Sequence, residues 1–454
     1  MKFKPHSYQQ YAIDFILQNP IAAILLDMGM GKTALTLMSI KCLMYELFEV
    51  RNVLVICPLR VTRTWRDEIE KWDELRGLSY SVVTGTAKQR TAALMADADI
   101  YIINRDNLVW LVEKSGVPFD YDCVIVDELS SFKNHQAARH KAFMRVRSKV
   151  KRIVGLTGTP ASNSLMDLFA EYKLLDGGTR LGKFIGQYRL NYFKPDKMNG
   201  PIVYSYKLLS GAEEKIYDKI SDITISMKAC DYLQMPELIS NEYPVYLDEK
   251  EMKQYKDMKD QLILSTPEHE VTAANAASLA NKLCQMANGA IYSDSEERDV
   301  IDIHSKKLDA LEDIIEAANG KPLLVAYWFK HDYDRIVARL EKIGVNYMKI
   351  DTDESISLWC ERKLQVALAQ PASMGHGLNL QSGGNVMVYY SLPFFNFELY
   401  DQANCRLYRQ GQQEGTVTII HLVAKGTIDE KIMKSLSDKD KTQSALIDAV
   451  KAEM

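Results

Sequence analysis

One short stretch near the N-terminus, Ile21–Thr33, constrains the fold of this chain more than any other. It reads IAAILLDMGMGKT, which is six apolar residues, a turn with two glycines and a Lys-Thr pair. The apolar run predicts a buried strand over residues 21–26, and the apolar residues that follow from Ala34 predict a helix. A strand, a glycine-rich turn and a helix N-terminus in this order form a loop whose backbone N–H groups can surround an anion.

The side chains of this loop are those that a bound phosphate group requires. Lys32 can reach the outer phosphates, and the hydroxyl of Thr33 can ligate Mg²⁺. The full pattern G-x-x-x-x-G-K-[ST] would place glycine at position 26, where this chain has Leu26. A glycine-rich turn with an unrelated Lys-Thr pair is the alternative, but strand and helix lie where the motif needs them. The residues expected around the phosphates are Met28, Gly29, Met30, Gly31, Lys32, Thr33 and Ala34.

Length and composition describe a globular protein with more than one domain. The chain has 454 residues, enough for two or three domains. Its net charge is −4, from 56 basic and 60 acidic residues, so any surface that binds nucleic acid must be local. No apolar run approaches the ~18 residues that span a bilayer, and the N-terminus lacks the apolar core of a signal peptide. The seven cysteines show no C-x-x-C spacing, which favours reduced thiols over disulfides or a zinc site.

The first half of the chain predicts a doubly wound parallel sheet. Apolar runs alternate with helical patterns, and polar residues follow successive runs. In such a sheet, ligands bind at the carboxyl ends of the strands. Besides the strand at 21–26, the predicted strands are 52–57, 79–83, 100–103, 123–126 and 153–156.

Two carboxylates, Asp127 and Glu128, directly follow the apolar run at 123–126. A charged pair at the end of a buried strand needs a compensating interaction. Beside a phosphate-binding loop, Asp127 would hold Mg²⁺ through water, and Glu128 would position and deprotonate an attacking water. The alternative is an acidic pair stabilised by a helix N-terminus.

Other polar residues take similar positions in the chain. Arg60, which follows the strand at 52–57, suits contact with a phosphate backbone, although a solvated helix face explains it equally well. Gln9, in a predicted helix before the phosphate-binding loop, can present its amide to adenine or can simply be solvated. Hydroxyls at Thr157 and Thr159, after the strand at 153–156, can relay the state of a nucleotide by hydrogen bonding.

The second half predicts a further α/β domain. Residues 166–235 are rich in aromatics and glycines and predict helices and loops appended to the first sheet. A charged helical stretch extends to about residue 289, after a strand at 241–247. The second strand series is predicted at 323–326, 345–350, 366–370, 386–390 and 417–422. The predicted organisation is therefore a first lobe at 1–165, an extension at 166–235 and a second lobe at 236–454.

Arg406 and Arg409 in the second lobe lie three residues apart, which would place them on one helix face. Two such arginines can stabilise charge on a γ-phosphate during its transfer. An arginine pair at this spacing, taken alone, is more often a solvated face.

The order of these motifs resembles superfamily 2 helicase-type ATPases, and within them short phage and bacterial Swi/Snf-type double-stranded DNA translocases. The resemblance extends from Gln9 to about Ile432. Its motifs are YQQ (8–10), DMGMGKT (27–33), PLRVTRTW (58–65), VDELSSFKN (126–134), LTGTPASNSL (156–165), GHGLNLQ (375–381) and QANCRLYRQGQ (402–412). The resemblance implies two RecA-like doubly wound lobes with a cleft between them, ATP and Mg²⁺ as cofactors, and a cytoplasmic location in a bacterial or phage-infected cell.

The resemblance also implies residue roles. Gln9 would recognise adenine, residues 28–34 would bind phosphate, and Thr33 and Asp127 would bind Mg²⁺. Lys32, Asp127, Glu128, Arg406 and Arg409 would be catalytic, the last two as arginine fingers. Residues implied to track DNA or couple it to ATP are Arg60, Thr62, Asn104, Thr157, Thr159, Gly375 and Asn379. The chain departs from the family at Leu129 and Ser130, where many relatives have DEAH or DEAQ, and this change bears on coupling rather than on hydrolysis.

The leading hypothesis is a monomeric, nucleic-acid-dependent ATPase that moves along DNA. Double-stranded DNA is favoured, whereas single-stranded DNA, RNA and an additional protein partner stay open, and no membrane is expected. One alternative is a helicase that separates strands. Another is an ATP-binding scaffold without hydrolysis, against which Lys32, Glu128 and Arg409 argue.

Overall fold

The computed structural model of this protein describes residues 1–161, 164–200, 202–261, 263–265, 270–272, 276–295, 298–374, 378–393 and 396–449. The chain forms two compact units. The first comprises Met1–Leu233 and the chain from Lys441 onward, and the second comprises Gln234–Asp440. No helix within the described ranges is long and apolar enough to cross a membrane.

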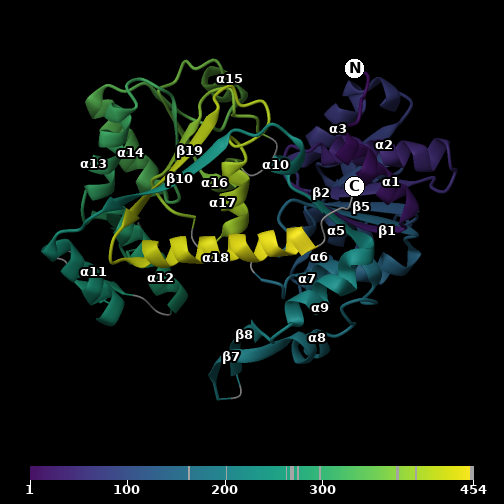
Figure 1. The fold of residues 1–454 in the computed structure, drawn as a ribbon, viewed down its shortest axis with the longest axis horizontal. Coiled ribbons are helices and arrows are strands. Elements are labelled where there is room, and N and C mark those ends of the chain that lie inside the picture. Colours follow the sequence, from purple (N-terminus) through teal and green to yellow (C-terminus); the bar gives the residue numbers. More distant parts are fainter. Residues whose placement is uncertain are drawn as a thin grey trace. The chain divides into compact units, whose positions relative to one another are not determined.

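The first unit is built on a seven-stranded sheet in the order β3-β4-β2-β5-β6-β1-β9 (Figure 1), in which all neighbouring strands are parallel. Its strands are β1 (Ile21–Leu26), β2 (Val53–Cys57), β3 (Tyr80–Val83), β4 (Ile100–Asn104), β5 (Cys123–Asp127), β6 (Arg152–Thr157) and β9 (Thr224–Met227). Because the strands are parallel, their carboxyl ends meet at one edge. The six strands predicted in this half are all present.

The strands of this sheet are covered on both faces. Every residue of β2, β5 and β6 is buried, which explains why the sequence shows continuous apolar runs rather than alternation. Helix α1 (Ser7–Gln18) precedes the first strand. The helices between the strands are α2 (Lys32–Tyr45), α3 (Val61–Lys71), α4 (Ala87–Leu94), α5 (Leu108–Glu113) and α6 (Ala138–Val146).

The extension after β6 contains helices and also three strands that the sequence did not predict. Strands β7 (Phe193–Asn199) and β8 (Ile202–Leu208) form an antiparallel hairpin beside α8 (Ile185–Tyr192) in Figure 1. Strand β9 joins the main sheet next to β1. It escaped prediction because its four buried residues, TISM, include two hydroxyls. The helices α7 (Leu168–Asp176), α9 (Ala212–Ile220) and α10 (Ala229–Tyr232) complete the extension.

The second unit has its own parallel sheet of six strands in the order β10-β19-β18-β15-β17-β16. These strands are β10 (Glu237–Val245), β15 (Leu323–Ala326), β16 (Tyr347–Lys349), β17 (Val366–Ala369), β18 (Val386–Tyr389) and β19 (Thr416–Ala424). Together with the first sheet, this confirms the predicted fold class of two α/β lobes with parallel sheets.

Helices also surround the second sheet. They are α11 (Glu249–Gln261), α12 (Ala276–Asn288), α13 (Lys306–Ala317), α14 (Lys330–Ile343), α15 (Asp353–Cys360), α16 (Pro371–Met374) and α17 (Phe397–Asn404). Helix α18 (Ile428–Ala449) begins in this unit, and its residues from Lys441 belong to the first unit. The prediction of continuous helix to about residue 289 was wrong, because strands β11 (Ile263–Ser265) and β12 (Glu270–Thr272) separate α11 from α12. Their β-branched residues favour an extended backbone. A second short hairpin pairs β13 (Ala290–Tyr292) with β14 (Val300–Asp302).

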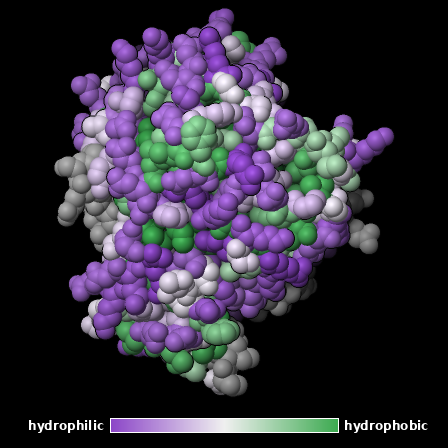
Figure 2. Space-filling model, turned by 90° about the vertical axis from the view of Figure 1, so that its right-hand side faces the viewer, coloured by the Kyte–Doolittle hydropathy of each residue, from purple (hydrophilic) through white to green (hydrophobic). Residues whose placement is uncertain are grey.

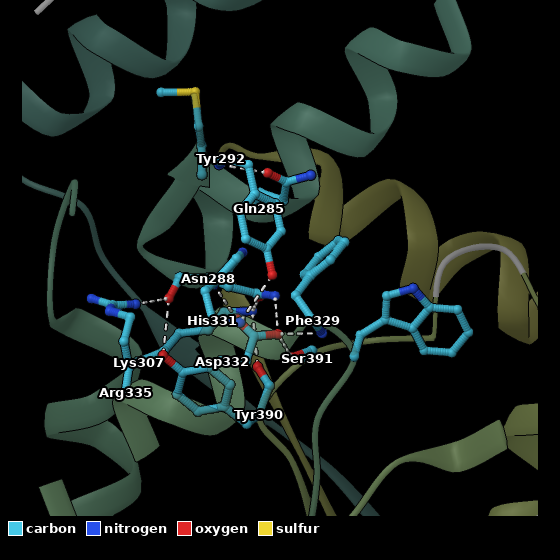
Figure 3. Close-up of polar contacts among 12 residues, drawn as sticks. Gln285, Asn288, Tyr292, Lys307, Phe329, His331, Asp332, Arg335, Tyr390 and Ser391 are labelled. Carbon is cyan, nitrogen blue, oxygen red and sulfur yellow. Dashed lines mark hydrogen bonds and ion pairs between the residues drawn. The ribbon is translucent and has the colours of Figure 1, made fainter. Parts of the chain in front are cut away.

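A buried polar network connects several elements of the second unit (Figure 3). The fully buried ammonium of Lys307 donates to Asn288 Oδ1 at 2.9 Å. The same ammonium lies 2.7 Å from Asp429 Oδ2. The amide of Asn288 in turn donates to Asp332 Oδ2 at 3.1 Å. Since both members of the Lys307–Asp429 pair are withdrawn from water, each depends on the other for charge compensation.

The face of the molecule in Figure 2 is mainly hydrophilic, with several apolar patches among the polar side chains. The large apolar residues are instead concentrated in the cores around the two sheets. This distribution is the one expected from the sequence composition.

Candidate nucleotide-binding site

The loop between β1 and α2 has the conformation that a phosphate-binding loop needs. Gly29 and Gly31 have φ angles of +84° and +79°, in the left-handed region that favours glycine. A Cβ on Gly31 would lie 2.7 Å from Gln9 Nε2, so a side chain there would displace the Gln9 amide. Helix α2 begins at Lys32, directly after Gly31, and its N-terminal N–H groups therefore border the loop.

The ammonium of Lys32 turns back over the carboxyl end of β1. Its Nζ donates to the carbonyls of Leu26 at 2.7 Å and Asp27 at 3.2 Å. Leu26 itself is the last residue of β1, fully buried and paired with Met227 of β9. Position 26 therefore belongs to the strand rather than to the loop, which explains why glycine is not required there. Thr33 follows in the first turn of α2 and is partly exposed.

Gln9 of α1 bonds this loop through its amide nitrogen and the start of its own helix through its amide oxygen. Its Nε2 donates to the carbonyl of Met30 at 3.2 Å, and its Oε1 accepts the N–H of His6 at 3.0 Å. The hydroxyl of Tyr8 donates to the same Met30 carbonyl at 3.3 Å. A carboxamide has two N–H groups and two acceptor lone pairs. Beyond these bonds it has one donor and one acceptor, the pair that an adenine edge requires.

Asp127 ends β5 and is nearly completely buried. Its Oδ2 accepts the indole N–H of Trp65 at 2.8 Å, and its Oδ1 accepts the N–H of Glu128 at 3.1 Å. Burial raises the pKa of Asp127, while the Trp65 N–H and the charge of Lys32 act in the opposite direction. Carboxylate oxygens are ligands that Mg²⁺ prefers, and each oxygen of Asp127 keeps a lone pair beyond these bonds, so Asp127 could hold a divalent cation.

Glu128 stands where β5 gives way to a short 3-10 turn (Leu129–Phe132). Its φ of +59° and ψ of +62° are left-handed, a conformation that costs a non-glycine residue of order 1 kcal/mol. The turn directs the chain away from the sheet immediately after the acidic pair. Leu129, one of the departures from the family pattern, points into the core and is fully buried.

Several predicted contact residues of the first unit are used in local hydrogen bonds. Asn104 Oδ1 accepts the N–H of Asp106 at 3.3 Å, and the Thr62 hydroxyl donates to the Leu59 carbonyl at 2.7 Å. Thr62 and Asn104 are buried, whereas Arg60 at the start of α3 is exposed. Among the three residues Arg60, Thr62 and Asn104, the side chain of Arg60 is therefore the one exposed to solvent.

Thr157 is the last residue of β6 and Thr159 lies two residues beyond it, and both are fully buried. The N–H of Thr159 donates to the Thr157 hydroxyl at 3.1 Å. Within the described part of the chain, the Thr159 hydroxyl has no hydrogen-bond partner. A buried hydroxyl in this position can take up a partner at little steric cost, since it only needs to rotate.

The prediction that Arg406 and Arg409 share one helix face was wrong, because α17 ends at Asn404. The bonds from Arg406 N to Ala403 O and from Arg409 N to Leu407 O span only three and two residues, so the chain leaves the helical path. Residue spacing alone does not show where a helix ends, so the end of α17 before Arg406 could not be recognised from the sequence.

The two arginines nevertheless converge on one segment of the second unit. Arg406 Nη1 donates to the Leu378 carbonyl at 3.3 Å, and Arg409 Nη1 donates to Asn379 Oδ1 at 2.6 Å. Burial lowers the pKa of Arg409. The structure thus brings Arg406, Arg409 and the predicted coupling residue Asn379 together. Gly375, predicted for the same role, lies outside the described residues.

Sequence reasoning missed two polar contacts at the edge of the first sheet. Trp65 donates to Asp127, as described above, and Asp27 Oδ2 accepts the N–H of Ala229 at 2.8 Å. Burial raises the pKa of Asp27, and the Ala229 N–H opposes this shift. A buried tryptophan usually needs a hydrogen-bond acceptor for its N–H, so the sequence could have indicated that Trp65 has a polar partner. It could not have indicated that this partner is Asp127.

The chain is similar to several known proteins. The family model of the SNF2-related domain matches residues 8–179. Putative protein p41 of Acyrthosiphon pisum secondary endosymbiont phage 1 is 37% identical over 461 residues, covering 99% of each chain. The SWI/SNF-related matrix-associated actin-dependent regulator of chromatin subfamily A-like protein 1 of Xenopus tropicalis is 24% identical, covering 96% of this chain and 44% of that protein.

Two further similarities concern a helicase and a solved structure. An uncharacterized ATP-dependent helicase of Mycoplasma genitalium is 23% identical, over 95% of this chain and 41% of that protein. The chain thus spans less than half the length of this helicase and of the Xenopus protein. The Sulfolobus solfataricus SWI2/SNF2 ATPase core in complex with dsDNA has a TM-score of 0.46 and 22% identity, covering 98% of this chain and 93% of that one. The chain belongs to the SNF2-related family, the Swi/Snf-type branch of the superfamily 2 helicase-type ATPases.

Proposed function

We propose that this protein is a motor that hydrolyses ATP to ADP and phosphate while it moves along double-stranded DNA. The observation that carries the proposal is the pairing of two features at one sheet edge. Lys32 follows a left-handed glycine turn at the end of β1, and the acidic pair Asp127–Glu128 ends β5. Burial raises the pKa of Asp127, and the nearby charge of Lys32 acts against this rise. This combination is the one used for phosphoryl transfer in nucleotide hydrolases.

Binding of ATP would use the first unit. The backbone of residues 28–34 would surround the phosphates, and Lys32 would exchange its carbonyl partners for phosphate oxygens. Thr33 and Asp127 would hold Mg²⁺, which supplies charge that neutralises the phosphate oxygens. Gln9 would use its remaining donor and acceptor on adenine while it keeps its bond to Met30.

Hydrolysis would depend on residues of both units. Glu128 would accept a proton from the attacking water, since its carboxylate is adjacent to the Asp127 that holds the metal. Arg406 and Arg409 would donate to the γ-phosphate as negative charge shifts during transfer. Both arginines contact residues 378–379, so this segment would respond when they turn to the nucleotide.

The proposed track is duplex DNA, and its contacts are proposed at the polar edges of the two sheets. Exposed Arg60 would contact a phosphate, and Asn104, Thr62, Gly375 and Asn379 would support the loops that approach DNA. Thr157 and Thr159 would relay the nucleotide state through the rotation of a buried hydroxyl. The relative from Xenopus carries the name of a chromatin regulator, which favours DNA over RNA.

The first test is phosphate release by the wild type and by Glu128→Gln, measured with double-stranded DNA, single-stranded DNA and RNA. We expect double-stranded DNA to stimulate the wild type and Glu128→Gln to lose about 10³-fold or more of the rate. Glu354→Gln, an exposed residue of α15, is the matched control and should hydrolyse normally. Phosphate release that no nucleic acid stimulates would contradict the motor.

A second test distinguishes translocation from strand separation. Displacement of a third strand from a triplex reports movement along duplex DNA, whereas release of a strand from a forked duplex reports unwinding. We expect ATP-dependent displacement in the first assay and little strand release in the second. The opposite pattern would favour the helicase alternative.

A further inference from the structure

Trp65 connects helix α3 to the acidic pair of β5. It is fully buried, and its indole N–H donates to Asp127 Oδ2 at 2.8 Å. The two residues are 62 positions apart in the chain. They meet because α3 directly follows β2, and β2 pairs with β5 along the sheet.

The hydrogen bonds of Asp127 determine how its carboxylate is oriented. Oδ1 accepts the N–H of the adjacent Glu128, a bond within the same backbone segment, at 3.1 Å. The Trp65 bond therefore anchors the carboxylate to a different element of the fold. With one N–H on each oxygen, the carboxylate plane is defined and each oxygen has a further lone pair. Partners of this kind orient a metal ligand, and their loss typically weakens metal binding.

We propose that Trp65 is a positioning residue that holds Asp127 in the orientation in which it binds the Mg²⁺ of a Mg²⁺–nucleotide complex. This inference rests on the proposed nucleotide site. The indole serves two purposes, since its rings fill the core and its N–H restrains the carboxylate. Phenylalanine retains much of the apolar volume but has no N–H, so Trp65→Phe separates these two contributions.

The same helix supplies a matched control. Trp72, at the end of α3, also donates its indole N–H to a carboxylate, Glu68 Oε2, at 2.6 Å. Glu68 lies in the same helix α3 and has no proposed part in metal binding. Trp72→Phe therefore removes the same kind of hydrogen bond without touching Asp127.

The experiment measures equilibrium binding of a fluorescent N-methylanthraniloyl-ADP by anisotropy at increasing Mg²⁺ in the absence of DNA. For Trp65→Phe, we expect the half-saturating Mg²⁺ concentration to rise about tenfold. Its nucleotide affinity in EDTA should stay that of the wild type, because the phosphate-binding loop is unchanged. Trp72→Phe should match the wild type under both conditions.

Two further variants guard against a simple folding defect. Benzothienylalanine at position 65 keeps the shape of the indole and replaces the N–H by sulfur, so it should reproduce the Mg²⁺ shift in a stably folded protein. In the background of Asp127→Asn, Trp65→Phe should add no further shift, because the two residues act as one unit.

The inference is overturned if Trp65→Phe or the benzothienylalanine protein needs the same Mg²⁺ as the wild type, or if Trp72→Phe shows an equal shift. These outcomes would leave the proposed function intact. If the wild type binds the nucleotide with Mg²⁺ but never hydrolyses ATP, the proposed motor function is contradicted. The Mg²⁺ titration would still test the proposed role of Trp65 in that case. A wild type without any Mg²⁺-dependent binding would contradict both.

Discussion

The side chain of Leu129 occupies the space beside Gly155, with its Cδ2 only 2.8 Å from where a Cβ on the glycine would lie. Leu129 follows the acidic pair after β5, and Gly155 lies within the adjacent strand β6. Leu129, where the chain departs from the family's acidic motif, thus fits because position 155 is a glycine without a side chain. Packing of this kind keeps the backbone after Glu128 in one position.

This relationship predicts that Gly155→Ala destabilises the protein. The added methyl group would overlap Leu129, and overpacking of a buried strand costs about 1–3 kcal/mol. Leu129→Ala in the same chain should recover part of the loss, since it removes the overlapping atoms. The free energy of unfolding, measured by urea denaturation, checks both expectations.

Gly186→Ala is the control for this pair. Gly186 lies in α8, and a Cβ there meets no atom within 4 Å. Alanine should therefore be neutral or slightly stabilising at this position. An equal loss of stability at 155 and 186 would show that steric overlap with Leu129 is not the cause.

The buried ion pair of the second unit predicts a large effect of Lys307→Met. This change would leave Asp429, which is 2–3% exposed, without its counter-charge at 2.7 Å. Removing one partner of a buried pair costs about 3–5 kcal/mol. Chemical denaturation followed by a probe in the second unit would measure the loss.

Lys363→Met provides the comparison with an exposed pair. Lys363 Nζ lies 2.6 Å from Glu361 Oε2, but the two side chains are 62% and 49% exposed. Such surface pairs contribute about 0–1 kcal/mol. If the two lysine variants lost similar stability, burial would not be what makes the Lys307 pair important.

Arg409→Ala should reduce catalysis far more than nucleotide binding. As a proposed arginine finger it acts mainly on the transition state, so kcat should fall by about 10³-fold while the affinity for ADP changes little. Arg362→Ala is the control, because Arg362 is exposed and pairs with Glu414 on the surface. DNA-stimulated phosphate release with a parallel ADP titration would test this. A rise in KM with unchanged kcat would assign Arg409 to substrate binding instead.

His304 predicts a pH dependence of stability. Burial lowers its pKa to about 4, and the positive charges of Arg335 and Lys307 add to this shift. Its Nδ1 accepts the N–H of Lys306 at 3.3 Å, so Nε2 carries the proton and donates to the Met286 carbonyl at 2.9 Å. The folded state therefore holds the neutral imidazole.

In the unfolded chain this histidine has a pKa of about 6.5, which is higher than in the folded protein. Between pH 6.5 and about 4 the unfolded chain binds a proton at this histidine and the folded chain does not. The free energy of unfolding should therefore fall as the pH falls, by at most about 1.4 kcal/mol per pH unit from this group. His304→Gln should reduce that slope in denaturation curves collected across the window. An unchanged slope would show that other groups cause the acid sensitivity.

Much of the fold could be predicted because a parallel sheet buried on both faces requires continuous apolar runs. The predicted strand at 21–26 matches β1, and the run at 323–326 matches β15. Strand β9 could not be found in this way, since Thr224 and Ser226 are buried polar residues within it. The Thr224 hydroxyl donates to the Ile220 carbonyl, a contact made within the fold and not encoded in any periodic pattern.

The sequence by itself determined the chemical groups of the proposed nucleotide site. A glycine turn followed by Lys32 and Thr33, and a carboxylate pair at a strand end, are local features, because backbone conformation and strand direction place such neighbours together. Only the tertiary structure decided which residues from distant parts of the chain contact these local features. Trp65 meets Asp127 because β2 and β5 are adjacent in the sheet, and Gln9 meets Met30 because α1 packs by the loop. Such contacts depend on strand order and packing, which no stretch of sequence specifies alone.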